Sequence, residues 1–383
     1  DNLATQGGGA ASNGFKADVE YKGCEFIENK GSFAAAIFTQ NDTTRLRVND
    51  CYFTSNICEG SGGCILVNTN IAASITNTQF YLNFADFGGA IAANGDSLLI
   101  LDRCIFLENF ATTQAAAINF NHVNALLTNC LFGKNINSGD GAGGGISSNA
   151  SDGQVSSVKA VNCTFANNLA TLGAGIAQWE ESDNAIAELY LTNCLFQNPD
   201  GENYSIEEGT PDVISTGGNQ SSDGSLTAYL TAAKDLSNTS QTFTDPDNND
   251  FRPLPGSPAA NGGVTTGAPD VDITGAPRTG TPDVGCYEFN TVNVNVPGLK
   301  LLPLSCAPNP AHNQTAVSLS NARQGQVEIS VWNQTGQRVV SVLVEKTGEQ
   351  LNHTLNVQQL PAGVYKIQAR MGDMLHESVL VKQ

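Results

Sequence analysis

The sequence predicts an all-β protein: a right-handed parallel β-helix (β-solenoid) followed by a small Ig-like β-sandwich. A short motif recurs at spacings of 26 to 33 residues through the first half of the chain. Gly (39 residues) and Asn are abundant, and long helical periodicity is missing. Short alternating strands follow one another near the C-terminal end. Repeats of this length with two short β segments and Asn/Gly corners are typical of solenoid coils rather than of helical repeats.

The composition narrows the function classes. The 383 residues carry 18 Lys plus Arg against 37 Asp plus Glu, a formal net charge of −19. We therefore expect no nucleic-acid partner, because that affinity comes mainly from clustered basic side chains. Hydrophobic residues make up 40% and charged residues 14%, which excludes a wholly disordered acidic chain. No apolar run reaches the ~18 residues of a membrane-spanning helix, so we expect no transmembrane segment.

The repeat has two elements. The first is Cys-x-Phe-x-x-Asn, and the second is a run of small residues that ends in Ile, 11 to 14 residues after the Phe. The first element recurs at Cys24/Phe26/Asn29, Cys51/Phe53/Asn56, Thr78/Phe80/Asn83, Cys104/Phe106/Asn109, Cys130/Phe132/Asn135, Cys163/Phe165/Asn168 and Cys194/Phe196/Asn198. The second element ends at Ile37, Ile65, Ile91, Ile118, Ile146 and Ile176.

A coil of this kind cannot bury its apolar side alone, so equivalent positions must stack along the axis, about 4.7–4.9 Å apart. We therefore expect Phe to stack on Phe inside the solenoid and Asn to bond Asn at one corner. The chirality rule for parallel crossovers predicts the right-handed winding. The residue before the Cys is Asn in several coils, which predicts a second Asn ladder: Asn77, Asn129, Asn162 and Asn193.

Phe-x-x-Asn paired with Gly-Gly-Ala-Ile resembles the repeat of the polymorphic outer-membrane protein family. The pairing recurs through about 170 residues of this chain. The resemblance implies a β-helical passenger of the adhesin or autotransporter kind. Residues 2–10 also parallel residues 168–176, so we expect the chain to begin in the middle of a coil, with further sequence upstream.

Regular coils are expected over residues 1–200, and irregular final coils with a cap over 201–290. The segment Asp283-Val284-Gly285-Cys286-Tyr287-Glu288 resembles the "DxGxxE" ending of bacterial β-helix proteins of the variable-anchor class. Cys286 stands where a small residue is usual, which a buried site should tolerate. Residues 291–298 alternate Val and Asn and are expected to form a linker.

Residues 299–383 change in character and are expected to form a separate sandwich. The chain there contains Pro-Asn-Pro, Gly-Gln-x-Val, Leu-Pro-Ala-Gly-x-Tyr and a terminal strand with a basic end. In this order the marks resemble the type A C-terminal sorting domain of type IX secretion substrates. The residues that carry the resemblance are Pro308, Asn309, Pro310, Gly336, Leu360, Pro361, Gly363, Tyr365, Lys382 and Gln383.

That resemblance implies export to the cell surface or the medium, with the type IX translocon and an outer-membrane β-barrel shuttle protein as partners. It also implies that the terminal strand and the Leu360–Tyr365 turn face the secretion machinery, the strand through unpaired edge groups. Gly363 is expected to have a positive φ, which a larger residue resists.

Cysteine use leaves two states open. Six of the ten cysteines occupy the repeating slot, where parallel Cβ vectors suit a disulfide poorly, so buried thiols are favoured over bridges in that ladder. Cys58 and Cys64 flank a Gly-rich turn and are a possible disulfide.

Other candidate sites are weaker. Asp245, Asp247, Asn249 and Asp250 form an oxygen-rich segment that could hold calcium, although Asp-Pro-Asp-Asn is also an ordinary turn signal. Thr43 and Ser97 stand in Asp-Ser/Thr-x contexts similar to bacterial O-glycosylation acceptors.

Catalysis by a β-helical enzyme needs carboxylates clustered on one face, often with Lys or Arg as base. The repeated slots hold Asn, Thr and Ser instead, and the four His are scattered. Trp179-Glu180-Glu181 could bind a sugar face but fits a loop packed on the wall better. The sequence therefore favours a non-enzymatic adhesin or structural passenger without a catalytic residue or obligate cofactor, with a carbohydrate or host-surface ligand. The alternative is a β-helical polysaccharide lyase or glycoside hydrolase.

Overall fold

The computed structural model describes residues 2–4, 8–14, 16–40, 44–254, 256–289, 304–320, 324–333, 337–348, 350–371 and 374–383. The chain divides into two compact units, one formed by Asp1–Thr244 with Phe251–Asn295 and the other by Asp245–Asp250 with Val296–Gln383. The expected linker, residues 291–298, lies outside the described residues. No helix in the described ranges is long and apolar enough to cross a membrane.

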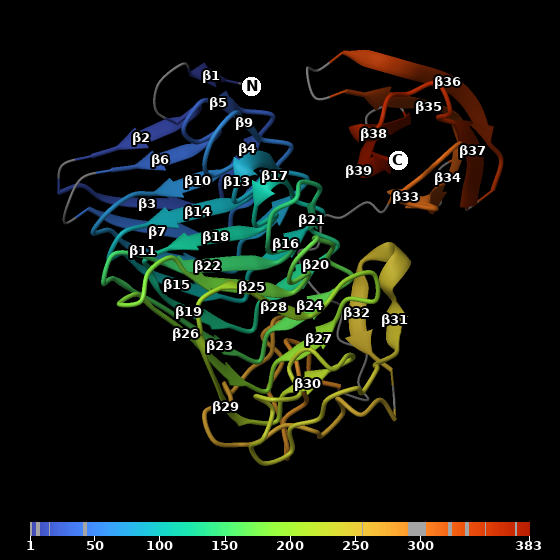
Figure 1. Ribbon diagram of the computed structural model, residues 1–383. Coiled ribbons are helices and arrows are strands. Elements are labelled where there is room, and N and C mark those ends of the chain that lie inside the picture. The colour runs from blue at the N-terminus through green and yellow to red at the C-terminus, as the bar shows by residue number, and fades with distance from the viewer. Residues whose placement is uncertain are drawn as a thin grey trace. The chain divides into compact units, whose positions relative to one another are not determined.

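The first unit is a parallel β-solenoid, as predicted (Figure 1). It has about eight turns. Each coil passes through four sheets, numbered here by their first strand, in the order sheet 3, sheet 4, sheet 1, sheet 2. Sheet 1 contains β1 (Leu3–Ala4), β5 (Lys30–Gly31), β9 (Ile57–Cys58), β13 (Phe84–Phe87), β17 (Phe110–Gln114) and β21 (Ile136–Asn137). Sheet 2 contains β2 (Ala11–Asn13), β6 (Ile37–Thr39), β10 (Ile65–Val67), β14 (Ile91–Asn94), β18 (Ile118–Asn121), β22 (Ile146–Ala150), β25 (Ile176–Glu180) and β28 (Tyr204–Glu208).

Sheets 3 and 4 complete the coil and lie on either side of the Cys position. Sheet 3 contains β3 (Asp18–Lys22), β7 (Arg45–Asn49), β11 (Ala72–Thr76), β15 (Leu98–Asp102), β19 (Asn124–Thr128), β23 (Val155–Val161), β26 (Ile186–Thr192) and β29 (Asp212–Gly217). Sheet 4 contains β4 (Glu25–Ile27), β8 (Tyr52–Thr54), β12 (Gln79–Tyr81), β16 (Ile105–Leu107), β20 (Leu131–Gly133), β24 (Thr164–Ala166), β27 (Leu195–Gln197) and β30 (Gln220–Ser221).

The predicted Phe stack fills the interior behind sheet 4. Neighbouring rings are nearly parallel, with centroids 4.5–4.9 Å apart. This separation matches the distance between neighbouring strands, so the backbone ladder sets the ring spacing. The stacked residues are Phe26, Phe53, Phe80, Phe106, Phe132, Phe165 and Phe196, and all are buried.

The small-residue runs form the sharp bend between sheets 1 and 2. At Gly88 φ is +62°, and a Cβ placed there would lie 2.1 Å from the Ile91 carbonyl oxygen, so the bend has no room for a side chain. The Ile residues that end these runs pair in register from β6 to β25 and point into the core.

The predicted Asn ladder is present at the corner between sheets 4 and 1. The Nδ2 of each Asn donates to the Oδ1 of the next at 2.9–3.1 Å. It runs through Asn2, Asn29, Asn56, Asn83, Asn109, Asn135, Asn168, Asn198 and Asn203.

The second predicted ladder is wrong as a continuous row. Its four Asn all have positive φ, between 49° and 52°. Asn193 Nδ2 donates to Asn162 Oδ1 at 3.2 Å, which joins two of them. Asn77 binds Asp50 instead, and Asn129, Asn162 and Asn193 bind the chain that returns over this corner after residue 263. The left-handed backbone conformation of these four residues was predictable from their being Asn, but their hydrogen-bond partners were not.

The residues after 200 close the solenoid. Leu226 and Leu230 join the interior cluster behind the last coils, so they cover its end. A short hairpin of β31 (Phe243–Asp245) and β32 (Asp250–Pro253) follows, joined by the 3₁₀ turn η1 (Pro246–Asn248). Phe251 is fully buried, and its ring occupies the space over Gly133 where a side chain would otherwise lie.

The second unit holds two antiparallel sheets. Their strands are β33 (Leu304–Ala307), β34 (Gln314–Ser320), β35 (Gly325–Trp332), β36 (Arg338–Lys346), β37 (Gln350–Asn356), β38 (Gly363–Met371) and β39 (Met374–Lys382). The sheet orders are β33-β34-β37 and β36-β35-β38-β39. Residues from both sheets, such as Val317, Ile329 and Ile367, share one buried cluster, as in a sandwich. The Ig-like topology and the hand of the solenoid stay predictions.

Replacing Phe106 with Ala should lower the free energy of unfolding by about 3–5 kcal/mol, because a fully buried ring is lost between two stacked neighbours. Denaturant titration of the whole chain measures it. Phe33→Ala is the matched control, since Phe33 is 50% exposed and should lose about 1 kcal/mol or less. Equal losses in the two variants would contradict the stacked interior.

Candidate functional site

The Pro-Asn-Pro segment lies along the last strand of the second unit. Asn309 Nδ2 donates to the Val379 carbonyl at 2.7 Å, and the Val381 N–H donates to Asn309 Oδ1 at 2.8 Å. The Ala311 N–H then donates to the Val381 carbonyl at 2.8 Å, and the Gln383 N–H to the Ala311 carbonyl at 3.0 Å. The side-chain amide of Asn309 thus makes the two hydrogen bonds with the backbone of β39 that a neighbouring strand would otherwise make.

This arrangement corrects the expected docking mode of the terminal strand. β39 is last in its sheet, but its outward backbone groups at Val379, Val381 and Gln383 are already bonded to residues 309–311. The C-terminal half of the edge is therefore covered, and a partner strand could pair there only after displacing this segment. Pro308 and Pro310 flank Asn309 and follow cis peptide bonds.

The Leu360–Tyr365 turn leads into β38 and is fixed by its own side chains. Tyr365 is 6% exposed, and its hydroxyl donates to the Pro361 carbonyl at 2.8 Å. Burial raises the pKa of the Tyr365 phenol. Leu360 packs against the shared core. Gly363 has a φ of +156°, so the expected positive φ is present.

The remaining sorting residues lie at two separate places. Lys382 pairs with Gly363 across β38 and β39, and its ammonium group donates to the Gln383 carbonyl. Gly336 lies outside the described residues. On either side of it, the Gln337 N–H donates to Asn333 Oδ1 and the Asn333 N–H to the Gln337 carbonyl, both at 2.9 Å, which closes the β35–β36 hairpin.

The family comparison decides what this unit is. Residues 305–382 match the family model of the secretion system C-terminal sorting domain. The match spans β33 to β39, including the covered edge and the turn. The sorting domain implies export by the type IX secretion system. No curated protein matches the chain.

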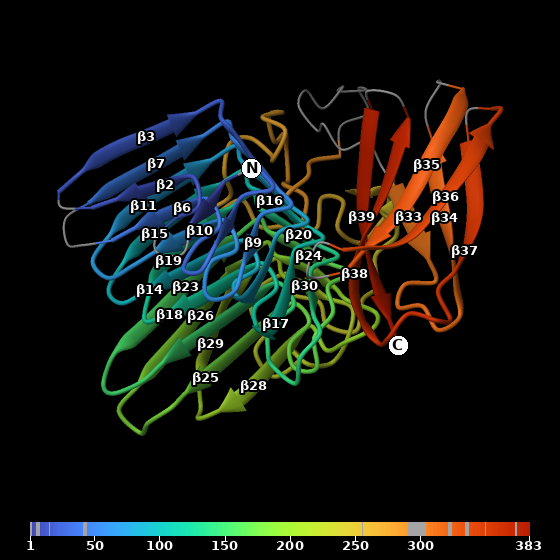
Figure 2. The same cartoon turned by 90° about the horizontal axis from the view of Figure 1, so that it is seen from above.

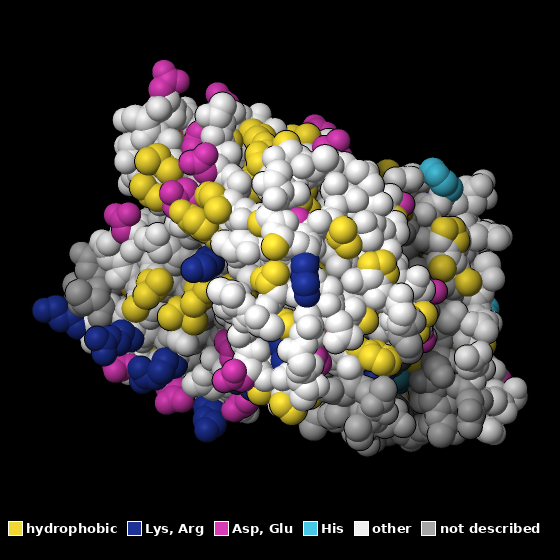
Figure 3. Space-filling view, turned by 90° about the horizontal axis from the view of Figure 1, so that it is seen from below, with side chains coloured by type: hydrophobic (Ala, Val, Ile, Leu, Met, Phe, Trp, Pro, Cys, Tyr) yellow, Lys and Arg dark blue, Asp and Glu magenta, His cyan; other side chains and the backbone are white. Residues whose placement is uncertain are grey.

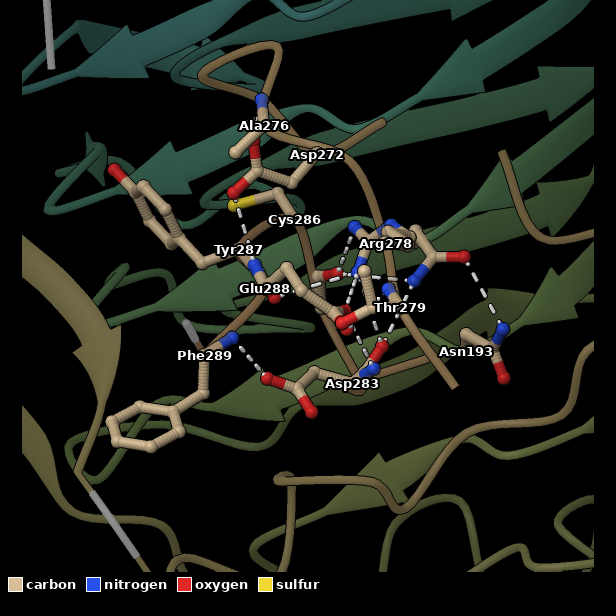
Figure 4. A network of polar contacts seen from close by, with 12 residues as sticks. Asn193, Asp272, Ala276, Arg278, Thr279, Asp283, Cys286, Tyr287, Glu288 and Phe289 are labelled. Carbon is tan, nitrogen blue, oxygen red and sulfur yellow. Dashed lines mark hydrogen bonds and ion pairs between the residues drawn. The ribbon is translucent and has the colours of Figure 1, made fainter. Parts of the chain in front are cut away.

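The sorting domain is preceded in the chain by a cap whose centre is a buried ion pair (Figure 4). Arg278 Nη1 lies 3.0 Å from Glu288 Oε2, with side-chain exposures of 4% and 3%. Arg278 Nη2 donates to the Gly285 carbonyl and to Asn129 Oδ1, at 3.0 and 2.9 Å. The pair therefore joins the Asp283–Glu288 motif to the solenoid corner. The Asp283–Glu288 motif was predictable from the sequence, but the role of Arg278 was not, because it is a single basic residue in a segment rich in Gly, Thr and Pro.

Asp272 and Asp283 complete the cap by binding backbone N–H groups. Asp272 Oδ1 accepts from Thr274 and Ala276, and Asp283 accepts from Asn261 and Phe289. Desolvation is the larger effect on Asp283 and raises its pKa, although these N–H groups oppose it. Cys286 is fully buried as expected, and burial raises its pKa to about 12. Asp272, Asp283 and Glu288 therefore hold the chain of the cap in place through hydrogen bonds and the ion pair.

All ten cysteines lie in the described ranges, and all are free thiols. The possible Cys58–Cys64 disulfide is therefore not formed. The reason is geometric: Cys64 belongs to the solenoid interior, whereas Cys58 packs with Ala35 and Ala85 in a separate cluster at the wall. Burial raises the pKa of the Cys58 thiol to about 11.

The possible calcium segment forms the β31–β32 hairpin turn. The Asp245 carboxylate caps η1 by accepting from the Asn248 backbone N–H and, at 2.7 Å, from Asn248 Nδ2. Within the described part of the chain, no three His, Cys, Asp or Glu side chains lie where they could hold a metal ion. The positions of Asp245, Asp247, Asn249 and Asp250 therefore give calcium binding no support.

The two glycosylation candidates have different outcomes. Ser97 is fully buried, and its hydroxyl lies 2.7–2.8 Å from the Asn68 and Asn94 carbonyls while it accepts from the Ile71 N–H. A glycan cannot be attached there in the folded protein, so this prediction is wrong. Thr43 lies outside the described residues.

The Trp179–Glu181 segment packs on the wall. Trp179 is 4% exposed and its indole N–H donates to Glu181 at 3.3 Å, so the ring has no open face for a sugar. The two Glu180 oxygens accept from the Ala187 and Thr210 N–H groups. The structure adds Glu207 to this group, and desolvation, followed by the charges of Glu208 and Glu181, raises its pKa. On the face seen in Figure 3, acidic side chains are dispersed, and several lie beside Lys or Arg.

Thiol counting tests the cysteine assignment. In the native protein a thiol-specific reagent should react quickly with the half-buried Cys24 and Cys306 and leave the eight buried cysteines unmodified, because burial limits the access of the reagent. After unfolding without reductant, all ten should react. A count below ten in the unfolded, unreduced chain would reveal a disulfide and contradict the assignment.

Proposed function

We propose that the chain is a non-enzymatic passenger of the type IX secretion system, whose β-solenoid acts outside the cell as an adhesin or structural protein. The observation that carries the proposal is the sorting domain at residues 305–382, on a chain whose other compact unit is a long solenoid. The translocon and an outer-membrane β-barrel shuttle protein would be its export partners. The resemblance of the Phe-x-x-Asn repeat to polymorphic outer-membrane proteins supports the adhesin role.

The arrangement of the outward rows supports binding rather than catalysis. A lyase or hydrolase needs a carboxylate with a partner acid or base in one groove. The outward row of sheet 3 that begins at Asp18 continues instead with Arg45, Ala72, Leu98 and Asn124. The acids around Trp179 accept backbone and side-chain hydrogen bonds, which suits a structural role.

Export is tested in a bacterium with a working type IX system. The full chain should reach the cell surface or the medium, and removal of residues 304–383 should retain it in the periplasm. The same full chain should also be retained in a translocon-deficient strain. Asn309→Ala is a milder variant: we expect reduced export, because the segment that covers β39 loses both of its side-chain bonds to the strand. Normal delivery after removal of residues 304–383 would contradict the sorting role.

The passenger role needs a separate measurement. Purified chain should release no reducing ends and no unsaturated products from a panel of acidic and neutral polysaccharides, while cells that display it should adhere to surfaces better than cells that do not. Turnover of any polysaccharide, lost on Glu207→Gln but kept on Glu188→Gln, would overturn the proposal in favour of a lyase or hydrolase.

A further inference from the structure

The outward face of sheet 3 forms one flank of the solenoid (Figure 2). In six of its eight strands, from β7 to β26, buried residues alternate with exposed or half-exposed ones, and in β3 exposed residues alternate with half-exposed ones. The register of the pairs aligns the outward residues in two straight rows. One row is Asp18, Arg45, Ala72, Leu98, Asn124, Ser157, Glu188 and Asp212, and the other is Glu20, Arg47, Ser74, Ile100, Leu126, Lys159, Tyr190 and Ile214.

Large hydrophobic side chains are exposed on this flank. Leu98 and Ile100 on β15 are 47% and 37% exposed, and Val155 and Ile186 on β23 and β26 are 40% and 44% exposed. Leu126, half-exposed, is the partner of Ile100 on the next strand. Leu98, Ile100 and Leu126 lie on the two central strands, whereas Val155 and Ile186 form a separate pair nearer to the β29 end of the sheet. Exposed apolar side chains grouped in this way mark a surface that associates with another protein.

Arg45 and Glu188 carry opposite charges at equal distances from the centre of this flank, whereas the two end strands carry the acids Asp18 and Asp212 in the same row. Arg45 lies on β7, second in the sheet, and Glu188 on β26, second from the other end. Arg45 forms no ion pair within the described chain, whereas the neighbouring Arg47 is already held by Asp18 at 2.6 Å. Glu20 accepts from Asn49, so both acids of β3 are engaged within their own copy.

We propose that two copies of this chain associate through the outward faces of sheet 3, about a two-fold axis parallel to the strands. This symmetry reverses the order of strands, so β7 of one copy faces β26 of the other and β15 faces β19. Arg45 then meets Glu188 twice, once on each side, and Arg47 meets Tyr190. At the centre Ile100 faces Leu126. These pairs are complementary in the way a two-fold interface requires, whereas Asp18, which Arg47 of its own copy already holds, faces Asp212 at the edge of the interface.

The size of the face suits such a dimer. Eight strands at about 4.8 Å and a width of about five residues at about 3.3 Å give roughly 600 Å² on each copy. The two faces together would bury roughly 1,200 Å², the lower end of specific protein interfaces. Arg45 and Glu188 lie toward the rim, where they would set the register rather than supply most of the affinity.

Sedimentation velocity on the full chain over a concentration series tests the proposal. The wild-type protein should form a dimer, and Ile100→Glu should be monomeric or at least about tenfold weaker in self-association, because it introduces charge at the apolar centre. Leu236→Glu is the matched control: Leu236 is 41% exposed on the same compact unit but pairs with Gln220 of β30 in sheet 4, so its dimer should persist. A monomeric wild type, or equal weakening by both variants, would overturn the proposal.

Charge reversal tests whether the partner is a second copy in this register. Arg45→Glu alone and Glu188→Arg alone should each weaken the dimer, since each brings like charges together at both contacts. An equimolar mixture of the two variants should form a heterodimer, because both contacts then regain opposite charges. If the mixture forms no heterodimer, the two-fold register is overturned. This outcome does not depend on the role of the passenger outside the cell.

Discussion

The row of Asn side chains at the corner between sheets 4 and 1 is the interaction on which the solenoid depends. Asn109 shows why: its Oδ1 accepts from the N–H and the Nδ2 of Asn83, and its Nδ2 donates to Asn135 Oδ1 and to the Phe80 carbonyl, all at 2.9–3.2 Å. Each amide therefore satisfies the backbone and the side chain of a neighbouring coil. Because these groups are fully buried, a missing partner would cost the desolvation of a polar group.

That constraint leaves the outward surface free to differ from coil to coil. The Asn ladder fixes where each coil bends, and the hydrogen bonds between paired strands fix the distance between neighbouring coils. The Phe rings stack at the same distance and fill the interior. Outward positions carry no such requirement, so sheet 3 can present charged side chains on β7, apolar ones on β15 and a carboxylate on β26. The sorting domain brings the separate function of export, with its own core and a covered terminal strand.

The sequence predicted the features that repeat, because periodicity alone determines them. Phe106 and Asn109 recur at the coil spacing, so stacking was the one way to bury both. Features that depend on a single distant partner were missed or wrong. The Arg278–Asn129 bond joins residues 149 positions apart, and the Ser97 hydroxyl is satisfied by carbonyls within its own corner and the previous coil. No local pattern specifies such contacts. The sorting domain was predictable because several of its marks occur in a fixed order.

The most direct test of the account is the free energy of unfolding of Asn109→Ala. The substitution removes four bonds and leaves buried donors of Asn83 and a buried acceptor at Phe80 without partners, so the loss should be at least about 3 kcal/mol. Asn124→Ala, an exposed Asn on the outer face of β19, is the control and should change stability by about 0.5 kcal/mol or less. Losses of similar size in the two variants would contradict the claim that the Asn ladder holds the coils together.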